Sequence, residues 1–334
     1  MTRIAVLGVG AVGARVARQL VSTDGVNEVV LRDEQTDRLE TMARSLGDGA
    51  RIDPHPYSAP LDVDVVVLAG PVGTHVGLAR RLLADGTPIV SVSDGVRDVR
   101  GLLGLDIEAR ERGVSVVVGA GMAPGLSCVL AAHAAARYDR VDEVHVAKAG
   151  TGGPACAREH HRSLGASSLD WRDGGWVQRS GGSGRELCWF PDPIGAQDCY
   201  RAALPDALVL VQAFPGVTRV TARVAANRRD RLTARLPMLW PSHPEGGPGA
   251  IRVEVRGRRG ASRDVTVLGA MDRPAVAAGA VAALTALWST QGRLLRMGAG
   301  GLAELVEPGP FLDELRARGV RAAVFQPDAG GSSV

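Results

Sequence analysis

The chain has 334 residues, 45% of them hydrophobic, which is enough for two hydrophobic cores and excludes a disordered protein. Its formal net charge is +3, and basic residues are scattered among acids, which argues against a nucleic-acid or membrane surface and favours a small-molecule partner. Strand-like sequence begins at Arg3 and no apolar stretch approaches the roughly 18 residues of a membrane span, so we expect a cytoplasmic protein. The four cysteines lie singly, which favours free thiols and no metal site.

The first 122 residues alternate between apolar strands and amphipathic helices. The continuous apolar run at residues 3–8 is typical of a parallel strand buried on both faces, and residues 11–21 repeat apolar side chains at helical spacing. Further strands are expected at residues 28–31, 64–69, 88–92 and 114–118, and further helices at residues 36–46, 74–84 and 99–112. This alternation predicts an α/β fold with a doubly wound parallel Rossmann sheet.

A G-x-G-x-x-G motif, formed by Gly8, Gly10 and Gly13, lies between the first strand and the first helix. The motif alone is a weak signal in a chain with 43 glycines, but its position is the one that a dinucleotide-binding turn requires. Gly8 permits the tight turn, Gly10 lets the backbone approach a pyrophosphate, and Gly13 allows close helix packing. The helix N-terminus, with Ala11 and Val12, then offers unpaired N–H groups to the phosphates. A glycine turn without a ligand is the alternative.

Asp33 lies 20 residues beyond Gly13, just after the second strand. A carboxylate at that place accepts hydrogen bonds from the adenosine ribose, which favours NAD as the cofactor. The neighbouring Arg32 leaves NADP open, because its guanidinium would bind a 2′-phosphate.

Two more segments end strands at the carboxyl edge of the predicted sheet, where ligands of open α/β folds bind. Gly70 and Pro71 follow the strand at residues 64–69 and are expected to line the cofactor channel. Asp94 follows the strand at residues 88–92, and it either contacts the nicotinamide ribose or the substrate, or caps the next helix.

The glycine-rich stretch at residues 119–125 marks the crossing into a second domain. Strands and irregular segments dominate from residue 141 onward, and the hairpin at residues 251–268 alternates apolar and charged side chains. We expect a Rossmann domain at residues 1–122, completed by a returning helix at about 273–297, and an α+β substrate and dimerisation domain with a mixed or antiparallel sheet at 123–272. The expected minor features are a crossing helix at 126–137, a surface loop at 173–184, and a tail at 298–334 with one short helix and a disordered end.

Three segments resemble the saccharopine dehydrogenase-like family of NAD(P)-binding oxidoreductases. They are the glycine motif, the strand at residues 64–67 with its Gly-Pro turn, and the Gly-Met-Ala-Pro-Gly-Leu-Ser stretch at residues 121–127 before a helix. The resemblance covers the Rossmann part well and residues 141–262 only in outline. It implies a dehydrogenase or reductase that acts on the C–N bond of an amino-acid-derived amine or imine, with an amino-acid-like substrate held by the second domain.

Lys148 is the single lysine among 39 basic residues. A bias toward arginine explains the others, and the survival of Lys148 is either chance or the mark of a position that needs an ammonium able to lose its proton. It ends the apolar strand at residues 144–147, where an active-site side chain would be presented. Hydride transfer needs a proton donor or acceptor beside the cofactor, and Lys148 is a candidate for that role.

His160 and His161 are the other candidates for proton transfer. If residues 157–162 are helical, Arg158 and His161 share a face, and Arg158 would hold a substrate carboxylate beside an imidazole. A solvated charged helix is the alternative. Asp198, in a helix expected after the loop at residues 189–195, is a further candidate for contact with the substrate.

The motifs of other chemistries are missing: the sequence has no G-x-x-x-x-G-K-[ST], no H-E-x-x-H and no G-x-S-x-G. The hypothesis is therefore an NAD-linked dehydrogenase that binds its substrate between two domains and pairs into a homodimer through the second-domain sheet. A dehydrogenase of CH–OH groups and a non-catalytic NAD-binding sensor or scaffold are the alternatives. An enzyme should bring Lys148 and His160 or His161 together at the nicotinamide, whereas a sensor need not.

Overall fold

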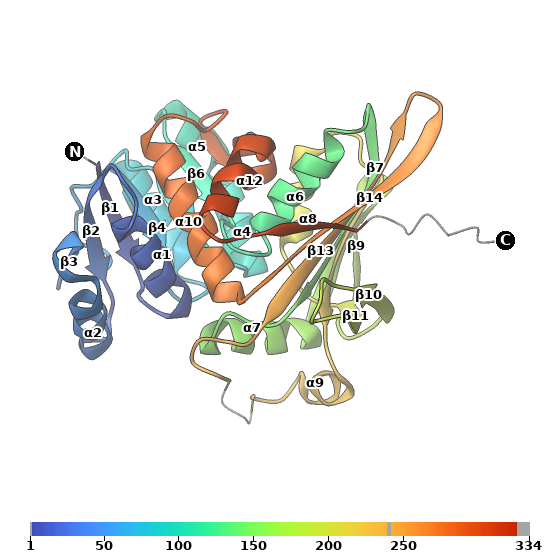
Figure 1. Cartoon of the computed structure of the whole chain (residues 1–334), viewed down its shortest axis with the longest axis horizontal. Helices are drawn as coiled ribbons and strands as arrows, with labels where there is room; N and C mark the ends of the chain where they lie inside the picture. The colour runs from blue at the N-terminus through green and yellow to red at the C-terminus, as the bar shows by residue number, and fades with distance from the viewer. Residues whose placement is uncertain (1, 239–241, 326–334) are drawn as a thin grey trace.

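The computed structural model describes residues 2–238 and 242–325, and two sheets dominate it (Figure 1). The first sheet is parallel throughout and has the strand order β15-β6-β5-β4-β1-β2-β3. Its central strands are buried on both faces, which explains their continuous valine and leucine runs. The strands are β1 (Thr2–Leu7), β2 (Val26–Arg32), β3 (Ala50–Ile52), β4 (Val65–Leu68), β5 (Ile89–Ser91), β6 (Ser115–Val118) and β15 (Gly298–Gly300).

Helices cover both faces of this sheet, as in a doubly wound fold. They are α1 (Ala11–Val21), α2 (Thr36–Leu46), α3 (His75–Ala84), α4 (Val96–Leu103), α5 (Asp106–Glu111), α10 (Pro274–Thr290), α11 (Leu302–Leu305) and α12 (Pro308–Ala317), with a short 3-10 turn η1 (Gly47–Gly49). Helix α10 returns from the second half of the chain to pack beside α1 (Figure 1). A Cβ at Gly279 would lie only 2.4 Å from the Cβ of Arg15, so the small residues of α10 are what allows the two helices to approach so closely.

The second sheet is mixed and follows the order β10-β11-β12-β7-β13-β14-β16, with β8 paired to β12 and β9. Only the β12–β7 pair is parallel among its named ladders. The strands are β7 (Arg140–Ala149), β8 (Ser167–Arg172), β9 (Gly175–Ser180), β10 (Glu186–Trp189), β11 (Ala196–Arg201), β12 (Arg219–Ala225), β13 (Gly249–Arg259), β14 (Ser262–Asp272) and β16 (Ala322–Phe325). Helices α6 (Leu126–Ala135) and α8 (Asp206–Ala213) cover the face toward the first sheet, and α7 (Pro154–Gly165) and α9 (Arg228–Thr233) lie at one end (Figure 1).

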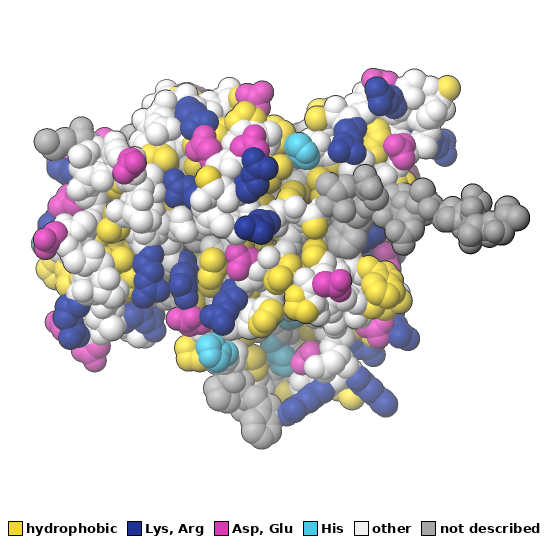
Figure 2. Space-filling view, in the orientation of Figure 1, with side chains coloured by type: hydrophobic (Ala, Val, Ile, Leu, Met, Phe, Trp, Pro, Cys, Tyr) yellow, Lys and Arg dark blue, Asp and Glu magenta, His cyan; other side chains and the backbone are white. Residues whose placement is uncertain are grey.

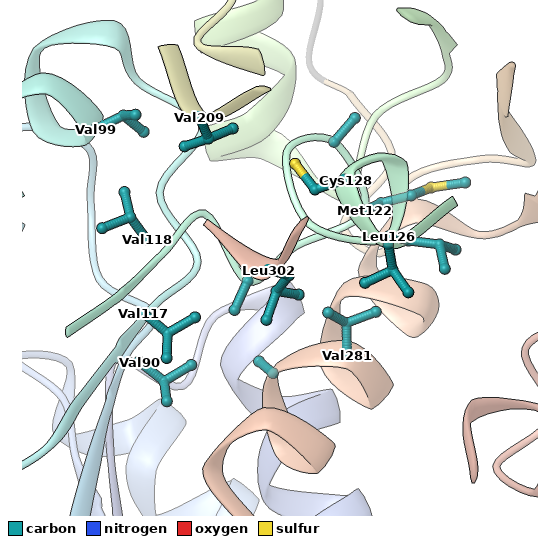
Figure 3. Packing of buried hydrophobic residues seen from close by; sticks show 14 of the residues in the cluster. Val90, Val99, Val117, Val118, Met122, Leu126, Cys128, Val209, Val281 and Leu302 are labelled. Atoms are coloured by element: carbon teal, nitrogen blue, oxygen red, sulfur yellow. The ribbon is translucent and has the colours of Figure 1, made fainter. Parts of the chain in front are cut away.

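One hydrophobic core joins the two halves. Figure 3 shows Val90 of β5 and Val281 of α10 on one side, and Leu126 of α6 and Val209 of α8 on the other, with Leu302 of α11 between them. The cleft between the sheets is therefore built on a continuous packed base.

The structure confirms the predicted α/β class and the mixed second sheet. Three expectations were wrong in detail. Residues 99–112 form two helices, because the chain turns between α4 and α5 near Gly104. The expected loop at 173–184 contains β9, whose ladder with β8 was not visible from its glycines. The tail is part of the fold, since β15 extends the first sheet and β16 the second. The expected disorder at 328–334 lies outside the described residues.

The described residues include no helix that is both long enough and apolar enough to cross a membrane. On the face shown in Figure 2, basic and acidic side chains are interspersed rather than segregated.

Candidate active site

The glycine turn has the geometry that a dinucleotide requires. Gly8 has φ +98°, and a Cβ there would lie 2.7 Å from the backbone of Ala69 and Gly70. A Cβ at Gly13 would lie 1.8 Å from the carbonyl oxygen of Gly8, so helix α1 sits directly against the turn. Around Gly10, by contrast, a Cβ would meet nothing within 4 Å. The N-terminus of α1 therefore has free space beside its backbone N–H groups, and this is the place where a pyrophosphate binds in a dinucleotide fold.

Asp33 lies at the carboxyl end of β2 and faces this turn. Its Oδ2 accepts a hydrogen bond from the backbone N–H of Val9 at 2.7 Å, and its Oδ1 accepts one from Gln35 at 2.8 Å. Each carboxylate oxygen has capacity for another donor, so ribose hydroxyls can still be bound. Arg38 lies nearby, with Nη1 3.9 Å from Asp33 Oδ2 and a side chain 46% exposed.

The structure does not bring Arg32, the candidate contact for a 2′-phosphate, to the cofactor turn. Arg32 is buried on the other side of β2, where its Nη2 lies 2.7 Å from Asp53 Oδ2. It also donates to the carbonyls of Pro56, Ala59 and Pro60. Successive strand residues point to opposite faces, so Arg32 turns inward when Asp33 faces the turn.

The loop at Gly70 and Pro71 is held from beneath by His75, which the sequence analysis had not selected. His75 is buried, and its Nε2 lies 3.1 Å from the Gly70 carbonyl oxygen while its Nδ1 lies 2.9 Å from Ser91 Oγ. Burial lowers the pKa of His75, so the ring is neutral, with Nε2 donating to the carbonyl and Nδ1 accepting from the hydroxyl. It ties the ends of β4 and β5 together at the cofactor edge.

A cavity of about 90 Å³ lies between the two sheets and contains Asp94 and Lys148. Val12 of the glycine motif forms part of its wall, so the cavity adjoins the cofactor turn. The other lining residues come from the end of β5, the crossing turn, the ends of β7 and β13, and the first turns of α7 and α10; they are Val92, Gly121, Met122, Ala123, Pro124, Ala149, Gly150, Gly152, Cys156, Ala250, Ile251, Pro274 and Ala278.

Lys148 and Asp94 form a pair in this cavity. Lys148 Nζ lies 3.6 Å from Asp94 Oδ2 and donates to the Ala123 carbonyl oxygen at 3.3 Å. Burial alone would lower the pKa of Lys148, but the Asp94 carboxylate, with Cys156 and Asp206 farther away, outweighs burial and raises the pKa above its ordinary value of 10.5. Lys148 is therefore an ammonium at neutral pH and can give up a proton. Asp94 does not cap α4, since Gly95 is the N-cap and no side chain caps that helix.

Cys156, another residue that the sequence analysis had not selected, contacts the same carboxylate. Its Sγ lies 3.8 Å from Asp94 Oδ2. Burial and the Asp94 charge raise the pKa of Cys156 to about 11, so the thiol stays protonated at neutral pH. It acts here as a weak hydrogen-bond donor rather than as a nucleophile.

The two histidines do not lie in this cavity. His160 and His161 line a second cavity, between α7 and α9, and their Nε2 atoms lie 3.3 Å from the Ala225 carbonyl and 3.0 Å from the Leu236 carbonyl. Burial and the ammonium of Lys148 lower the pKa of His160 to about 4, so this imidazole is neutral at pH 7. The expected convergence of Lys148 with a histidine is therefore not observed.

The two predicted substrate contacts lie elsewhere as well. Arg158 is on α7, as expected, but its side chain is exposed and does not line the cavity with Lys148. Asp198 belongs to strand β11 rather than to a helix, and its Oδ1 lies 2.9 Å from Arg185 Nε. No group of three or more histidine, cysteine or acidic side chains able to hold a metal occurs among residues 2–238 and 242–325.

Comparison with known proteins identifies the nucleotide-binding part. Residues 3–95 match the family described as NADP oxidoreductase, coenzyme F420-dependent. An inositol 2-dehydrogenase from Mycolicibacterium gilvum (strain PYR-GCK) is 39% identical over 111 residues, which are 33% of this chain and 31% of that protein. The matched segment thus spans about a third of the curated relative. It is an NAD(P)-binding domain of the oxidoreductase type.

Similarity of fold extends over the whole chain. Saccharopine dehydrogenase (L-Glu forming) from Saccharomyces cerevisiae superposes with a TM-score of 0.68 at 14% identity, over 98% of this chain and 100% of that one. An amine dehydrogenase from Mycobacterium smegmatis gives a TM-score of 0.52 at 13% identity, over 92% and 96% of the two chains. The predicted resemblance to saccharopine dehydrogenases is confirmed for the fold.

Proposed function

We propose that this protein is an NAD(P)-dependent dehydrogenase or reductase that acts on the C–N bond of a small amine or imine bound in the cavity between the sheets. The observation that supports it most is the Lys148–Asp94 pair, 3.6 Å apart, in a cavity whose wall includes Val12 of the cofactor turn. Imine reduction needs a proton donor beside the dinucleotide site, and the ammonium of Lys148 is such a donor.

The bound dinucleotide supplies or accepts the hydride. In the reductive direction, Lys148 donates its proton to the imine nitrogen, which makes the imine carbon electrophilic, and that carbon then takes the hydride to give the amine. Asp94 keeps Lys148 protonated before the transfer, and the Ala123 carbonyl fixes the direction of its ammonium. The oxidative direction needs Lys148 in its neutral form: the carbon loses its hydride, and the proton released from nitrogen returns to Lys148.

A dehydrogenase of CH–OH groups is the second candidate. The support for it is the 39% identity of the nucleotide-binding segment to a protein named inositol 2-dehydrogenase. The support for C–N chemistry from known proteins is the fold, since saccharopine dehydrogenase and an amine dehydrogenase share it. The same ammonium would polarise a carbonyl in an alcohol dehydrogenase. The two proposed activities therefore use the same Lys148–Asp94 pair and differ in their substrate.

Steady-state kinetics on a panel of carbonyl compounds, with and without ammonia, tests the proposal. We expect NADH oxidation that requires ammonia, a loss of about 100-fold or more in kcat for Lys148→Met, and unchanged NADH affinity in that variant. Arg158→Ala is the matched control, because that side chain is exposed outside the cavity, and it should keep wild-type activity. Turnover without ammonia favours the alcohol dehydrogenase, and full activity of Lys148→Met rejects the proton role.

We further propose that two copies pair through the open face of the second sheet. Cross-strand ion pairs cover this face, including Arg256 with Glu143 at 3.6 Å and Arg219 with Glu143 at 3.9 Å, and β14 exposes Val265 beside them. A face that carries both signs of charge and apolar side chains can match itself about a two-fold axis. Light scattering should give twice the monomer mass, and a monomer would reject the proposed dimer.

The free cysteines suit a reducing compartment, and we place the protein in the cytoplasm.

A further inference from the structure

Among the residues that the structure describes, one cationic side chain lines the cavity between the sheets, and that cation already has a partner. Asp94, Lys148 and Cys156 are its polar lining side chains, while the others are apolar or glycine. The Lys148 ammonium lies 3.6 Å from Asp94 and also donates to the Ala123 carbonyl. A carboxylate brought to Lys148 would have to compete with Asp94 for the ammonium and would lie next to a like charge.

The arginines around the cavity are engaged with other groups or point elsewhere. Arg15 Nη2 and Arg273 Nη1 share Glu245 Oε2, at 2.8 and 3.5 Å. Arg252 lies 2.6 Å from Glu254 on the opposite face of β13 from the cavity-lining Ile251. None of these arginines lines the described cavity, so it offers no guanidinium for a bidentate grip on a carboxylate.

Two buried acids lie near the pair. Glu159 of α7 and Asp206 of α8 both have pKa values raised by burial and by the Asp94 carboxylate, so this environment disfavours their charged forms. Asp206 is fully buried, with Oδ1 accepting from Ser127 at 2.9 Å and Oδ2 without a hydrogen-bond partner in the described structure. These two acids therefore offer a substrate carboxylate no positive partner.

We infer that the substrate is a small amine without a carboxylate, bound with its nitrogen at the Lys148–Asp94 pair and its carbon skeleton against Met122, Ile251 and Pro274. This inference rests on the proposed function and narrows its substrate class. It departs from an amino-acid substrate, for which Arg158 would have been the carboxylate partner. In the oxidative reaction the neutral amine gives a hydride from carbon to NAD⁺ and a proton from nitrogen to the neutral form of Lys148, and water converts the resulting imine to a ketone and ammonia.

Two matched substrate pairs test it. 2-Aminobutane and 2-aminobutanoate differ only in a methyl group against a carboxylate, and 2-butanol and 2-hydroxybutanoate repeat that difference for the alcohol reaction. We expect kcat/KM for 2-aminobutane to exceed that for 2-aminobutanoate by about 100-fold. Preference for 2-aminobutanoate would overturn the inference and leave the C–N activity standing. Turnover of the alcohols alone, or of none of the four, would overturn the C–N activity and the inference with it.

A charge-gain variant gives a second measurement. Met122→Arg adds a guanidinium to the cavity, and it should move the ratio of the two amine activities toward 2-aminobutanoate by about 10-fold or more. Met122→Leu is the matched control, because it changes shape without charge, and its ratio should stay at the wild-type value. If the ratio of the 2-aminobutane activity to the 2-aminobutanoate activity does not change in a folded Met122→Arg protein, the inference that the cavity lacks a partner for a carboxylate is contradicted.

Discussion

Replacing two glycines of the same turn by alanine should have opposite consequences. At Gly13 the new Cβ would lie 1.8 Å from the Gly8 carbonyl oxygen and 3.2 Å from Ala69 Cβ, so α1 must move away from the sheet. At Gly10 the new Cβ would meet no protein atom within 4 Å, and the backbone, with φ −67° and ψ −165°, is open to any residue. The Gly10 Cβ would occupy space that the pyrophosphate needs.

The overlap at Gly13 should cost about 3 kcal/mol of folding stability, the upper part of the range for overpacking, and lower Tm by roughly 4 °C. Gly10→Ala should leave the Tm of the ligand-free protein within about 2 °C, and weaken NADH binding by about 10- to 100-fold. Thermal melts and fluorescence titration with NADH measure both. Unchanged NADH affinity in Gly10→Ala would refute the assignment of this turn to the pyrophosphate, and an unchanged Tm in Gly13→Ala would refute the packing of α1.

Three further predictions concern ionisable side chains. Burial alone would raise the pKa of Asp53, but hydrogen bonds from Arg32 and His55 outweigh it and lower the pKa to about 2, so Asp53 contributes about 2 kcal/mol of stability above its ordinary pKa of 3.8. The difference in unfolding free energy between wild type and Asp53→Asn should shrink as pH falls from 4 toward 2, and a constant difference would contradict this. Asp33→Ser should weaken NADH binding about 10-fold and shift preference toward NADPH in parallel titrations, whereas unchanged selectivity would exclude a ribose contact. Asp94→Asn removes a charge that raises the pKa of Lys148, so the alkaline limb of the pH–rate profile should move to lower pH; an unmoved limb would exclude Lys148 as the acid.

Most of the first sheet could be predicted because its strands are buried on both faces. Val65–Leu68 is wholly buried, and only a continuous apolar run satisfies that environment. β15 is Gly298–Gly300, which has no apolar signal, and its strand conformation comes from pairing with β6. Such a strand depends on a partner far away in the chain, so local sequence does not reveal it.

Part of the candidate site could also be predicted from the local sequence. Asp94 and Lys148 were predicted because each lies near the end of a strand, and Lys148 also because it is the single lysine, although only the folded chain brings them together across the cleft. The placement of Cys156 depends on how α7 docks, which is fixed by close approach of Gly153 to Ala11 and is not a local property. The position of Arg32 away from the turn could have been predicted, because alternation along the chain at β2 places Arg32 and Asp33 on opposite faces.

The most direct test of the central claim is transfer of deuterium from 4-deuterated NADH. The protein would be incubated with butanone and ammonia, and the products analysed by mass spectrometry. We predict 2-aminobutane with one deuterium on the carbon that bears nitrogen, and almost none with Lys148→Met. Deuterated 2-butanol in place of the amine, or no deuterated product from the folded, NADH-binding protein, would contradict the account.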